Sequence, residues 1–217
     1  MRSRPAHAAS GVPSGVTASA ASATSTSIER RAVEAVLTCV AWYGVAKTTL
    51  DDVAREAGCA RATLYRYFPG KQQLLAAAVG AEVERVASEL QAVAAECATL
   101  EDAVVGIVAH AAREVTGHDA LQFVLRHELQ VLLPHLTFEG GDRLLSVIAA
   151  AVAPAVAPFL PADRVERSSE WIARVTLAYL MPHGSRVSMT DETQVRELVA
   201  DFVLPGLVPQ PSQPVRG

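Results

Sequence analysis

Two short segments with a helical spacing of apolar residues flank Gly58, and this pair constrains the fold more than any other feature. The first segment extends from Thr48 or Thr49 to Gly58, and the second from Ala60 to Tyr67. In both segments apolar residues recur three or four positions apart, which places them on one face of a helix. Glycine suits the tight turn between them because it lacks a Cβ atom. Two short helices around such a turn predict a helix-turn-helix unit.

The rest of the sequence also predicts helices. Half of the 217 residues are hydrophobic but only 5% are aromatic, so we expect a core of mainly Ala, Leu and Val side chains between helices. Capping residues and Pro or Gly breakers delimit the further helical segments. These are predicted at residues 28–43, 71–97, 99–117, 119–134, 142–157, 163–181 and 191–203. The expected fold class is all-α, with about nine helices and no strand.

Composition divides the chain into four regions. The N-terminal region is rich in Ala, Ser, Thr, Gly and Pro and lacks Leu and aromatic residues, so it cannot bury enough apolar surface to offset the entropy of ordering. The expected regions are a disordered arm (1–27), a three-helix helix-turn-helix domain (28–71), a second helical domain (72–207) and a flexible tail (208–217).

The start of the first helix has an alternative interpretation. The pair Arg30–Arg31 precedes a fairly apolar run, as in a twin-arginine export signal. However, Glu34 lies inside that run and no small-residue cleavage site follows it. The same residues show helical periodicity, and Thr26 with Glu29 forms a capping box at the start. We therefore expect an amphipathic helix here, stopped by Gly44.

Cysteine usage and hydropathy indicate a cytoplasmic protein without a membrane span. Cys39, Cys59 and Cys97 are an odd number, far apart, and frame neither a disulfide scaffold nor a zinc site. No uninterrupted apolar run approaches the about 20 residues that a spanning helix needs. The most apolar stretch, Val147–Leu160, is shorter and contains two prolines.

Charge is unevenly distributed along the chain. If it were spread evenly, a net charge of -4 would argue against binding to nucleic acid, because phosphate contacts require basic side chains. Residues 1–71, however, hold 9 Lys and Arg against 5 Asp and Glu, whereas residues 72–217 hold 10 against 18. Both lysines of the chain, Lys47 and Lys71, lie in the basic part. The acidic excess therefore belongs to the second domain, and the helix-turn-helix remains suited to phosphate contacts.

The outward face of the second short helix suits the major groove of DNA. Arg61 lies near its N-terminus, where a guanidinium can bind guanine through two hydrogen bonds, and Ala62 can contact a thymine methyl group. Nearby hydroxyl groups and lysines can donate to phosphates. The predicted DNA contacts are Lys47, Thr48, Thr49, Arg61, Ala62, Thr63, Tyr65, Tyr67 and Lys71.

The stretch TTLDDVAREAGCARATLYRYFPGK resembles the DNA-binding domain of TetR-type (TetR/AcrR) transcriptional regulators. The resemblance covers about residues 28–75. It implies that Thr49, Tyr65 and Lys71 contact phosphates and that Arg61 and Ala62 read bases. It also implies that the remaining chain forms a divergent helical domain that binds an inducer and dimerises. Cys59 departs mildly from the family pattern, which usually has an aliphatic residue there.

Polar residues within the apolar helices of the second domain are candidates for an effector site. Glu128 and Arg174 each share a helical face with apolar residues, so either they neutralise each other or one of them contacts a polar group of the ligand. The candidate ligand-binding residues are His110, His127, Glu128, Trp171 and Arg174. His127 and Glu128 resemble the start of an H-E-x-x-H metal motif, but Val131 occupies its second histidine position, so we expect no metal and no cofactor.

Two C-terminal helices carry apolar rows that suit a dimer interface. The resemblance implies that the last two helices pack against their symmetry mates as a four-helix bundle. The alternative is that the same rows belong to the core of one chain. The predicted interface residues are Ile172, Val175, Tyr179, Val195, Leu198, Val199 and Phe202.

These observations favour a ligand-responsive repressor over two other classes of protein. A homodimer would bind a palindromic operator in double-stranded DNA and leave it when a small hydrophobic or amphipathic inducer binds. An enzyme with an apolar cavity is the first alternative, but no nucleophile elbow, P-loop or dinucleotide motif is visible. A helical adaptor is the second alternative, in which the helix-turn-helix, with Tyr65 and Phe68 in its core, is purely structural.

Overall fold

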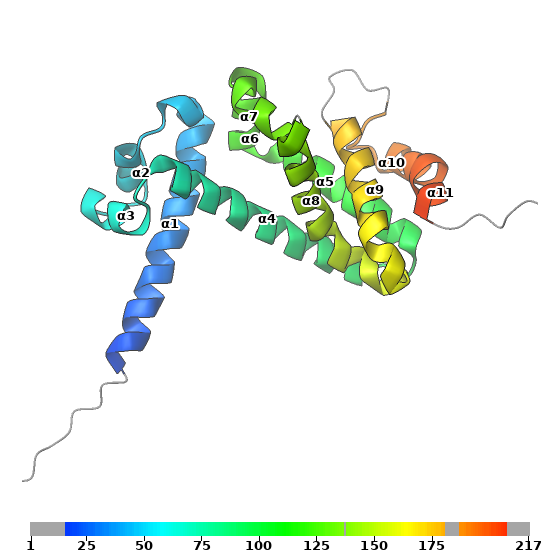
Figure 1. The fold of residues 1–217 in the computed structure, drawn as a ribbon, viewed down its shortest axis with the longest axis horizontal. Helices are drawn as coiled ribbons and strands as arrows, with labels where there is room; N and C mark the ends of the chain where they lie inside the picture. Colours follow the sequence, from blue (N-terminus) through cyan, green and yellow to red (C-terminus); the bar gives the residue numbers. More distant parts are fainter. Residues whose placement is uncertain (1–15, 137, 181–186, 208–217) are drawn as a thin grey trace, which may run out of the picture.

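The computed structural model describes residues 16–136, 138–180 and 187–207, and every regular element in these ranges is helical (Figure 1). The N-terminal helices are α1 (Val16–Lys47), α2 (Leu50–Glu56) and α3 (Arg61–Tyr67), and the long α4 (Lys71–Ala95) follows them. The second domain contains α5 (Leu100–Gly117), α6 (Asp119–His127), α7 (Leu129–Leu136), α8 (Phe138–Val156), α9 (Ala162–Leu180), α10 (Glu192–Leu198) and α11 (Leu204–Leu207). A 3-10 turn at Ala157–Phe159 follows α8, and a π-helical segment at Val199–Val203 joins α10 to α11. The predicted all-α fold class is confirmed for the described residues.

The N-terminal helices pack around one small core. Val36 of α1, Val53 of α2, Leu64 of α3 and Leu74 of α4 are fully buried in it. Thr49 starts α2 with the side-chain and backbone bonds of a capping box. The core and the cap together hold α2 and α3 in a helix-turn-helix arrangement that packs against α1.

Arg31 of α1 also fixes the turn of this unit. Its guanidinium donates hydrogen bonds to the carbonyl oxygens of Ala57 and Gly58, at the end of α2. A cation at the C-terminus of a helix interacts favourably with the helix dipole. Gly58 itself has a φ of 59°, a conformation that glycine adopts without strain. One arginine of the pair that resembles an export signal, Arg31, thus contributes to the fold of the N-terminal domain.

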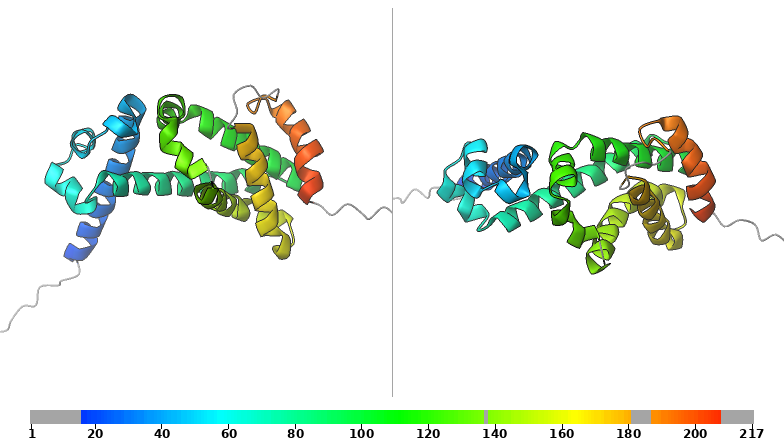
Figure 2. Two further views of the ribbon diagram at one scale, coloured as in Figure 1. Left: turned by 45° about the horizontal axis from the view of Figure 1, so that its top comes forward. Right: turned by 90° about the horizontal axis from the view of Figure 1, so that it is seen from above.

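The helix α4 connects this unit to the second domain (Figure 1 and Figure 2). Its first turn packs against α1, and its later turns pack against α5 and α8. The second core lies among α4, α5, α8, α9 and the C-terminal helices. Ile107, Ile172, Val195 and Val199 are fully buried there. The two cores are thus joined by one long helix, and Leu74 and Ala78 of that helix belong to the N-terminal core.

The helix α1 differs from the prediction at both ends. It begins at Val16, so Thr26 and Glu29 lie inside the helix and the predicted capping box does not start it. Part of the predicted arm is therefore helical, whereas residues 1–15 and the predicted tail at 208–217 lie outside the described residues. Gly44 interrupts the helix as expected, with a φ of 81° and a ψ of 168°, although helical geometry resumes up to Lys47.

The segment predicted as one helix over residues 119–134 is two helices. The helix is interrupted at Glu128, between α6 and α7. Pro134 lies inside α7 instead of ending a helix. The cap of α6 is His118 rather than Asp119, because the His118 Nδ1 atom accepts a hydrogen bond from the Leu121 amide at 3.2 Å. Periodicity alone missed the break because apolar residues continue across it.

The helix α8 is more apolar than the sequence analysis indicated. Residues Gly140–Phe159 are long and apolar enough to cross a membrane by length and composition, with a mean hydropathy of 1.5, although Asp142 and Arg143 interrupt the apolar run. Only 22% of this window is buried. In the structure α8 packs against α4 and α9 as a helix of the second domain (Figure 1). Part of its apolar surface stays exposed, since Val147 is 40% exposed.

Candidate nucleic-acid interface

The helix α3 presents a polar outer face because its inner face is anchored in the N-terminal core. Leu64 is fully buried, and Phe68, directly after the helix, is buried as well. Arg61 and Ala62 are exposed, together with Tyr65, which is 38% exposed. The structure therefore brings the predicted base-reading residues and Tyr65 together on one exposed surface. Whether they contact DNA stays a prediction.

The side chain of Arg61 is held at the surface by two neighbours. Its Nη1 atom lies 2.7 Å from Oδ2 of Asp51, and its Nη2 atom donates to the Tyr65 hydroxyl at 3.3 Å. Its guanidinium also lies over the Tyr65 ring, 5.2 Å from the ring centroid. The hydrogen bond to Tyr65 and the charge of Asp51 raise the pKa of Arg61, which stays a cation at every physiological pH. Asp51 was not predicted at this site, since sequence spacing does not pair a residue of α2 with one of α3.

A second arginine on α3, Arg66, was also missed by the sequence analysis. Arg66 is exposed, and its guanidinium lies over the ring of Tyr67, 5.1 Å from the centroid. Its Nη2 atom donates to the Tyr67 hydroxyl at 3.3 Å. Tyr67 and Thr63 are partly buried. The exposed end of α3 thus carries a further cation of the type that phosphates attract.

The two adjacent threonines have different roles in the structure. Thr48 is 1% exposed and its hydroxyl donates to the Gly44 carbonyl oxygen at 2.7 Å, so the predicted phosphate contact through this side chain is wrong. Thr49 is exposed, and its hydroxyl donates to Oδ2 of Asp52 at 2.6 Å. That hydrogen bond is the main cause that lowers the pKa of Asp52. Thr49 therefore caps α2 in the free protein, and its contact with a phosphate stays a prediction.

The two lysines flank the unit as expected but differ in their contacts. Lys47 is exposed at the end of α1. The Nζ atom of Lys71 donates to the carbonyl oxygens of Val45 and Ala46, at 3.0 Å and 3.3 Å. An ammonium group has three donors, so Lys71 keeps one for a phosphate. The exposed residues of α2, α3 and the lysines make this surface a candidate nucleic-acid interface of the helix-turn-helix class.

Comparison with known proteins identifies the family of this unit. Residues 33–78 match the family model described as bacterial regulatory proteins of the tetR family. The matched residues contain the whole helix-turn-helix and the start of α4. The N-terminal domain is therefore a DNA-binding helix-turn-helix domain of the tetR family, which supports a TetR-type transcriptional regulator.

Relatives and fold neighbours agree with this assignment. An uncharacterized HTH-type transcriptional regulator of Mycobacterium tuberculosis is 28% identical over 160 residues, which are 74% of this chain and 75% of the relative. The crystal structure of the TetR family repressor AlkX from a Dietzia strain, implicated in biodegradation of n-alkanes, has a TM-score of 0.60 at 22% identity and covers 81% of this chain and 95% of its own. FadR from Bacillus subtilis, solved with stearoyl-CoA, has a TM-score of 0.51 at 17% identity, and the match covers 79% of this chain and 97% of FadR. These structures share the fold.

The predicted effector residues do not converge on one site. Arg174 is exposed and pairs with Glu170 of its own helix at 2.6 Å, so the predicted pair of Glu128 and Arg174 is wrong. Trp171 donates its indole N–H to the Val203 carbonyl oxygen at 3.2 Å. His127 is exposed at the end of α6. Glu128 instead contacts the N-terminal domain.

His110 belongs to an ion-pair network between α4 and α5. Its Nε2 atom lies 3.0 Å from Oε2 of Glu89, and Glu114 lies beside both. Arg85 of α4 donates to Glu89 and to Glu114. Although partial burial acts to raise it, hydrogen bonds from Arg85 and His110 lower the pKa of Glu89. Glu89, His110 and Glu114 offer ligand atoms within 4.8 Å of one another, but the Arg85 guanidinium already engages both carboxylates.

Four of the predicted dimer-interface residues lie in the core of the chain: Ile172, Val195, Leu198 and Val199 are buried. Their burial supports the alternative that apolar rows of α9 and α10 pack within one protomer, and it corrects the interface prediction for these four residues. Val175 and Tyr179 are partly buried against the same cluster, whereas the side chain of Phe202 is 63% exposed. For these three residues the interface stays a prediction.

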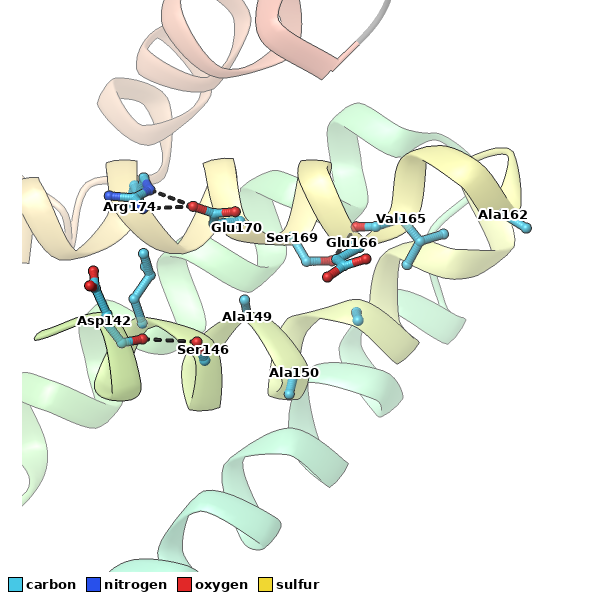
Figure 3. A pocket seen from close by; sticks show the side chains of 12 residues that line it. Asp142, Ser146, Ala149, Ala150, Ala162, Val165, Glu166, Ser169, Glu170 and Arg174 are labelled. Carbon is cyan, nitrogen blue, oxygen red and sulfur yellow. Dashed lines mark hydrogen bonds and ion pairs between the residues drawn. The ribbon is translucent and has the colours of Figure 1, made fainter. Parts of the chain in front are cut away.

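An open groove of about 610 Å³ lies between α8 and α9 (Figure 3). Ser146, Ala149 and Ala150 of α8 line one side, and Ser169 and Arg174 of α9 line the other. The groove is bordered by small side chains because alanine and serine face it from α8. Of the predicted effector residues, Arg174 alone lines this groove.

Proposed function

We propose that the chain is a ligand-responsive repressor that binds a palindromic operator as a homodimer. In this proposal α3 enters the major groove, and the two copies of α3 are separated by about 34–36 Å. The observation that carries the proposal is the exposed face of α3: the buried Leu64 anchors this helix, and Asp51 and Tyr65 bind the Arg61 guanidinium at its surface. An exposed arginine on a helix with a buried anchor suits readout of a guanine.

Binding to the intergenic DNA upstream of its own gene tests this proposal. Fluorescence anisotropy with that duplex and with a scrambled duplex gives the specificity ratio. Arg61→Ala is expected to lower that ratio by about tenfold or more, because a bidentate contact discriminates by about 1–3 kcal/mol. Arg113→Ala removes the same charge from an exposed position on α5 and is the matched control. Equal ratios for both variants refute the assignment of Arg61.

The effector in this proposal is a small hydrophobic or amphipathic molecule, and the protein acts in the cytoplasm. The apolar composition of the second domain supports this class of ligand. The fold neighbour FadR, solved with stearoyl-CoA, supports it further, since the same fold there holds an amphipathic acyl ligand. Native mass spectrometry of the purified protein identifies a bound molecule. That molecule is expected to release the duplex in the anisotropy assay, whereas an adaptor or an enzyme shows no such release.

For the homodimer we propose the exposed face of α8 and α9 as the contact with a second copy. Val147 is 40% exposed, and Ala150 and Pro154 are exposed on the same helix. A second copy would bury this apolar surface of α8. Ala150→Glu is expected to convert the dimer to a monomer in light scattering coupled to gel filtration. Ala92→Glu, at an exposed position of α4, is the matched control, and a dimer in both variants refutes this face.

A further inference from the structure

Glu128 is the one charged side chain among the buried residues that the structure describes, and it lies where the two domains meet. It is 8% exposed and caps α6, at the break between α6 and α7. Its Oε2 atom accepts a hydrogen bond from the Val45 amide at 2.6 Å, and its Oε1 atom accepts one from the Ala46 amide at 3.1 Å. Both carboxylate oxygens of Glu128, a residue of the second domain, thus accept hydrogen bonds from the backbone of the N-terminal domain.

The backbone that Glu128 binds is available because of the kink at Gly44. A continuous helix would use the amides of Val45 and Ala46 for its own hydrogen bonds. The non-helical geometry of Gly44, with a φ of 81° and a ψ of 168°, frees these amides and turns them toward α6. A buried carboxylate is costly without partners, and these two N–H groups provide them.

The opposite edge of the same two peptides is held by Lys71. Its Nζ atom donates to the carbonyl oxygens of Val45 and Ala46, at 3.0 Å and 3.3 Å. Lys71 is the first residue of α4, the helix that joins the domains. The short segment after the kink is therefore fixed from two sides, through its amides by Glu128 and through its carbonyls by Lys71.

Close packing leaves this contact little freedom. A Cβ atom at Gly44 would lie 2.6 Å from the Phe123 ring and 2.7 Å from the Glu128 carboxyl group. Ala120 and Val124 of α6 are buried in the same core as Val36 of α1. The side of α6 thus forms part of the N-terminal core, and its end is hydrogen-bonded to α1. A shift of α6 or α7 must either move the N-terminal domain or break the two bonds.

We propose that Glu128 is a positioning residue through which the second domain sets the orientation of the helix-turn-helix. With both bonds made, the N-terminal domain has a single orientation relative to α6 and α4. With the bonds broken, it samples several orientations, and fewer dimers have the spacing that the operator requires. A molecule that displaces α6 or α7 then controls DNA binding through this carboxylate. This inference rests on the proposed function for its effect on DNA, but the contact itself is independent of DNA.

Substitution of Glu128 in the full chain tests the proposal with two measurements. Glu128→Gln keeps the shape of the side chain but retains only one acceptor oxygen, and Glu128→Ala removes both. Hydrogen exchange at the amides of Val45 and Ala46 is expected to rise about tenfold or more in both variants, because a charge-assisted bond is lost. The affinity for the operator is expected to fall about tenfold. The matched control is Glu84→Gln, at an exposed position of α4.

The outcomes separate this proposal from the proposed function. Far-UV circular dichroism is expected to be unchanged in Glu128→Gln, which keeps the experiment interpretable if Glu128→Ala is less stable. Unchanged amide exchange in both variants overturns the contact. Faster exchange with operator affinity equal to that of the control variant overturns its role in positioning. A wild-type chain that binds no operator refutes the proposed function, while the exchange measurement still decides whether Glu128 holds the kinked segment.

Discussion

Replacing Gly44 by alanine tests whether the kink in α1 requires glycine. With a φ of 81° and a ψ of 168°, Gly44 occupies a region of backbone geometry that is almost exclusive to glycine. An alanine there adds strain of about 1–3 kcal/mol. The new Cβ atom would also lie 2.6 Å from the Phe123 ring and 2.7 Å from Glu128, and relief of such overpacking costs about 1–3 kcal/mol more. Gly44→Ala is therefore expected to lower the free energy of unfolding by about 2–6 kcal/mol.

The two tryptophans of the chain allow the N-terminal domain to be followed alone. Trp42 lies on α1 near the kink, and Trp171 lies on α9 in the second domain. In a Trp171→Phe background, urea unfolding followed by Trp42 fluorescence reports the N-terminal domain, while circular dichroism reports the loss of helix in the whole chain. Protein concentration is kept fixed because dimerisation would contribute to the apparent stability.

Gly80→Ala in the same background is the matched control. Gly80 lies inside α4, and no atom lies within 4 Å of an added Cβ atom. Alanine in a helix interior is favoured over glycine by about 0.5–1 kcal/mol, so this variant is expected to be as stable as its parent or more stable. A loss below about 1 kcal/mol in Gly44→Ala, or an equal loss in Gly80→Ala, refutes the reasoning.

Three further predictions concern the helix-turn-helix. Leu64→Ala leaves a cavity at a fully buried site, so we expect the free energy of unfolding in urea to fall by about 2–5 kcal/mol and operator binding to be lost. An unaltered free energy of unfolding would show that Leu64 is not a core residue. Asp52→Asn removes a carboxylate whose pKa is lowered in the folded state by Thr49. The stabilisation by that carboxylate is present above its unfolded pKa and is lost as the pH falls through the folded pKa, so wild type and variant should differ in unfolding free energy at neutral pH and converge in acid. Lys47→Ala should reduce the slope of log affinity against log salt by about 0.9, and an unchanged slope excludes a phosphate contact.

The helix-turn-helix could be predicted because its signals are local. Thr49 and Asp52 form the capping box that their spacing indicates, and Gly58 has the positive φ that a tight turn favours. Leu64 and Phe68 lie four residues apart and are both buried, as helical periodicity requires. Each of these features depends on residues within one or two turns of each other, so the sequence alone was sufficient to place them.

The second domain was predicted less well because its contacts join distant residues. An apolar row looks the same whether a neighbouring helix or a second copy covers it, and the rows with Ile172 and Val195 are buried within the chain. Arg174 and Glu128 both lie on apolar faces in the sequence, yet Arg174 is exposed. Periodicity gives the faces of a helix but not the partner of each face.

The sequence by itself determined the all-α class and the DNA-binding unit, together with the concentration of basic residues near it. The tertiary structure alone decided how that unit is held. Asp51 orients Arg61 across the turn, and Glu128 binds the amides of Val45 and Ala46 from a helix far along the chain. Caps and turns are encoded in neighbouring residues, whereas such a hydrogen bond exists only after two cores have formed and brought their surfaces together.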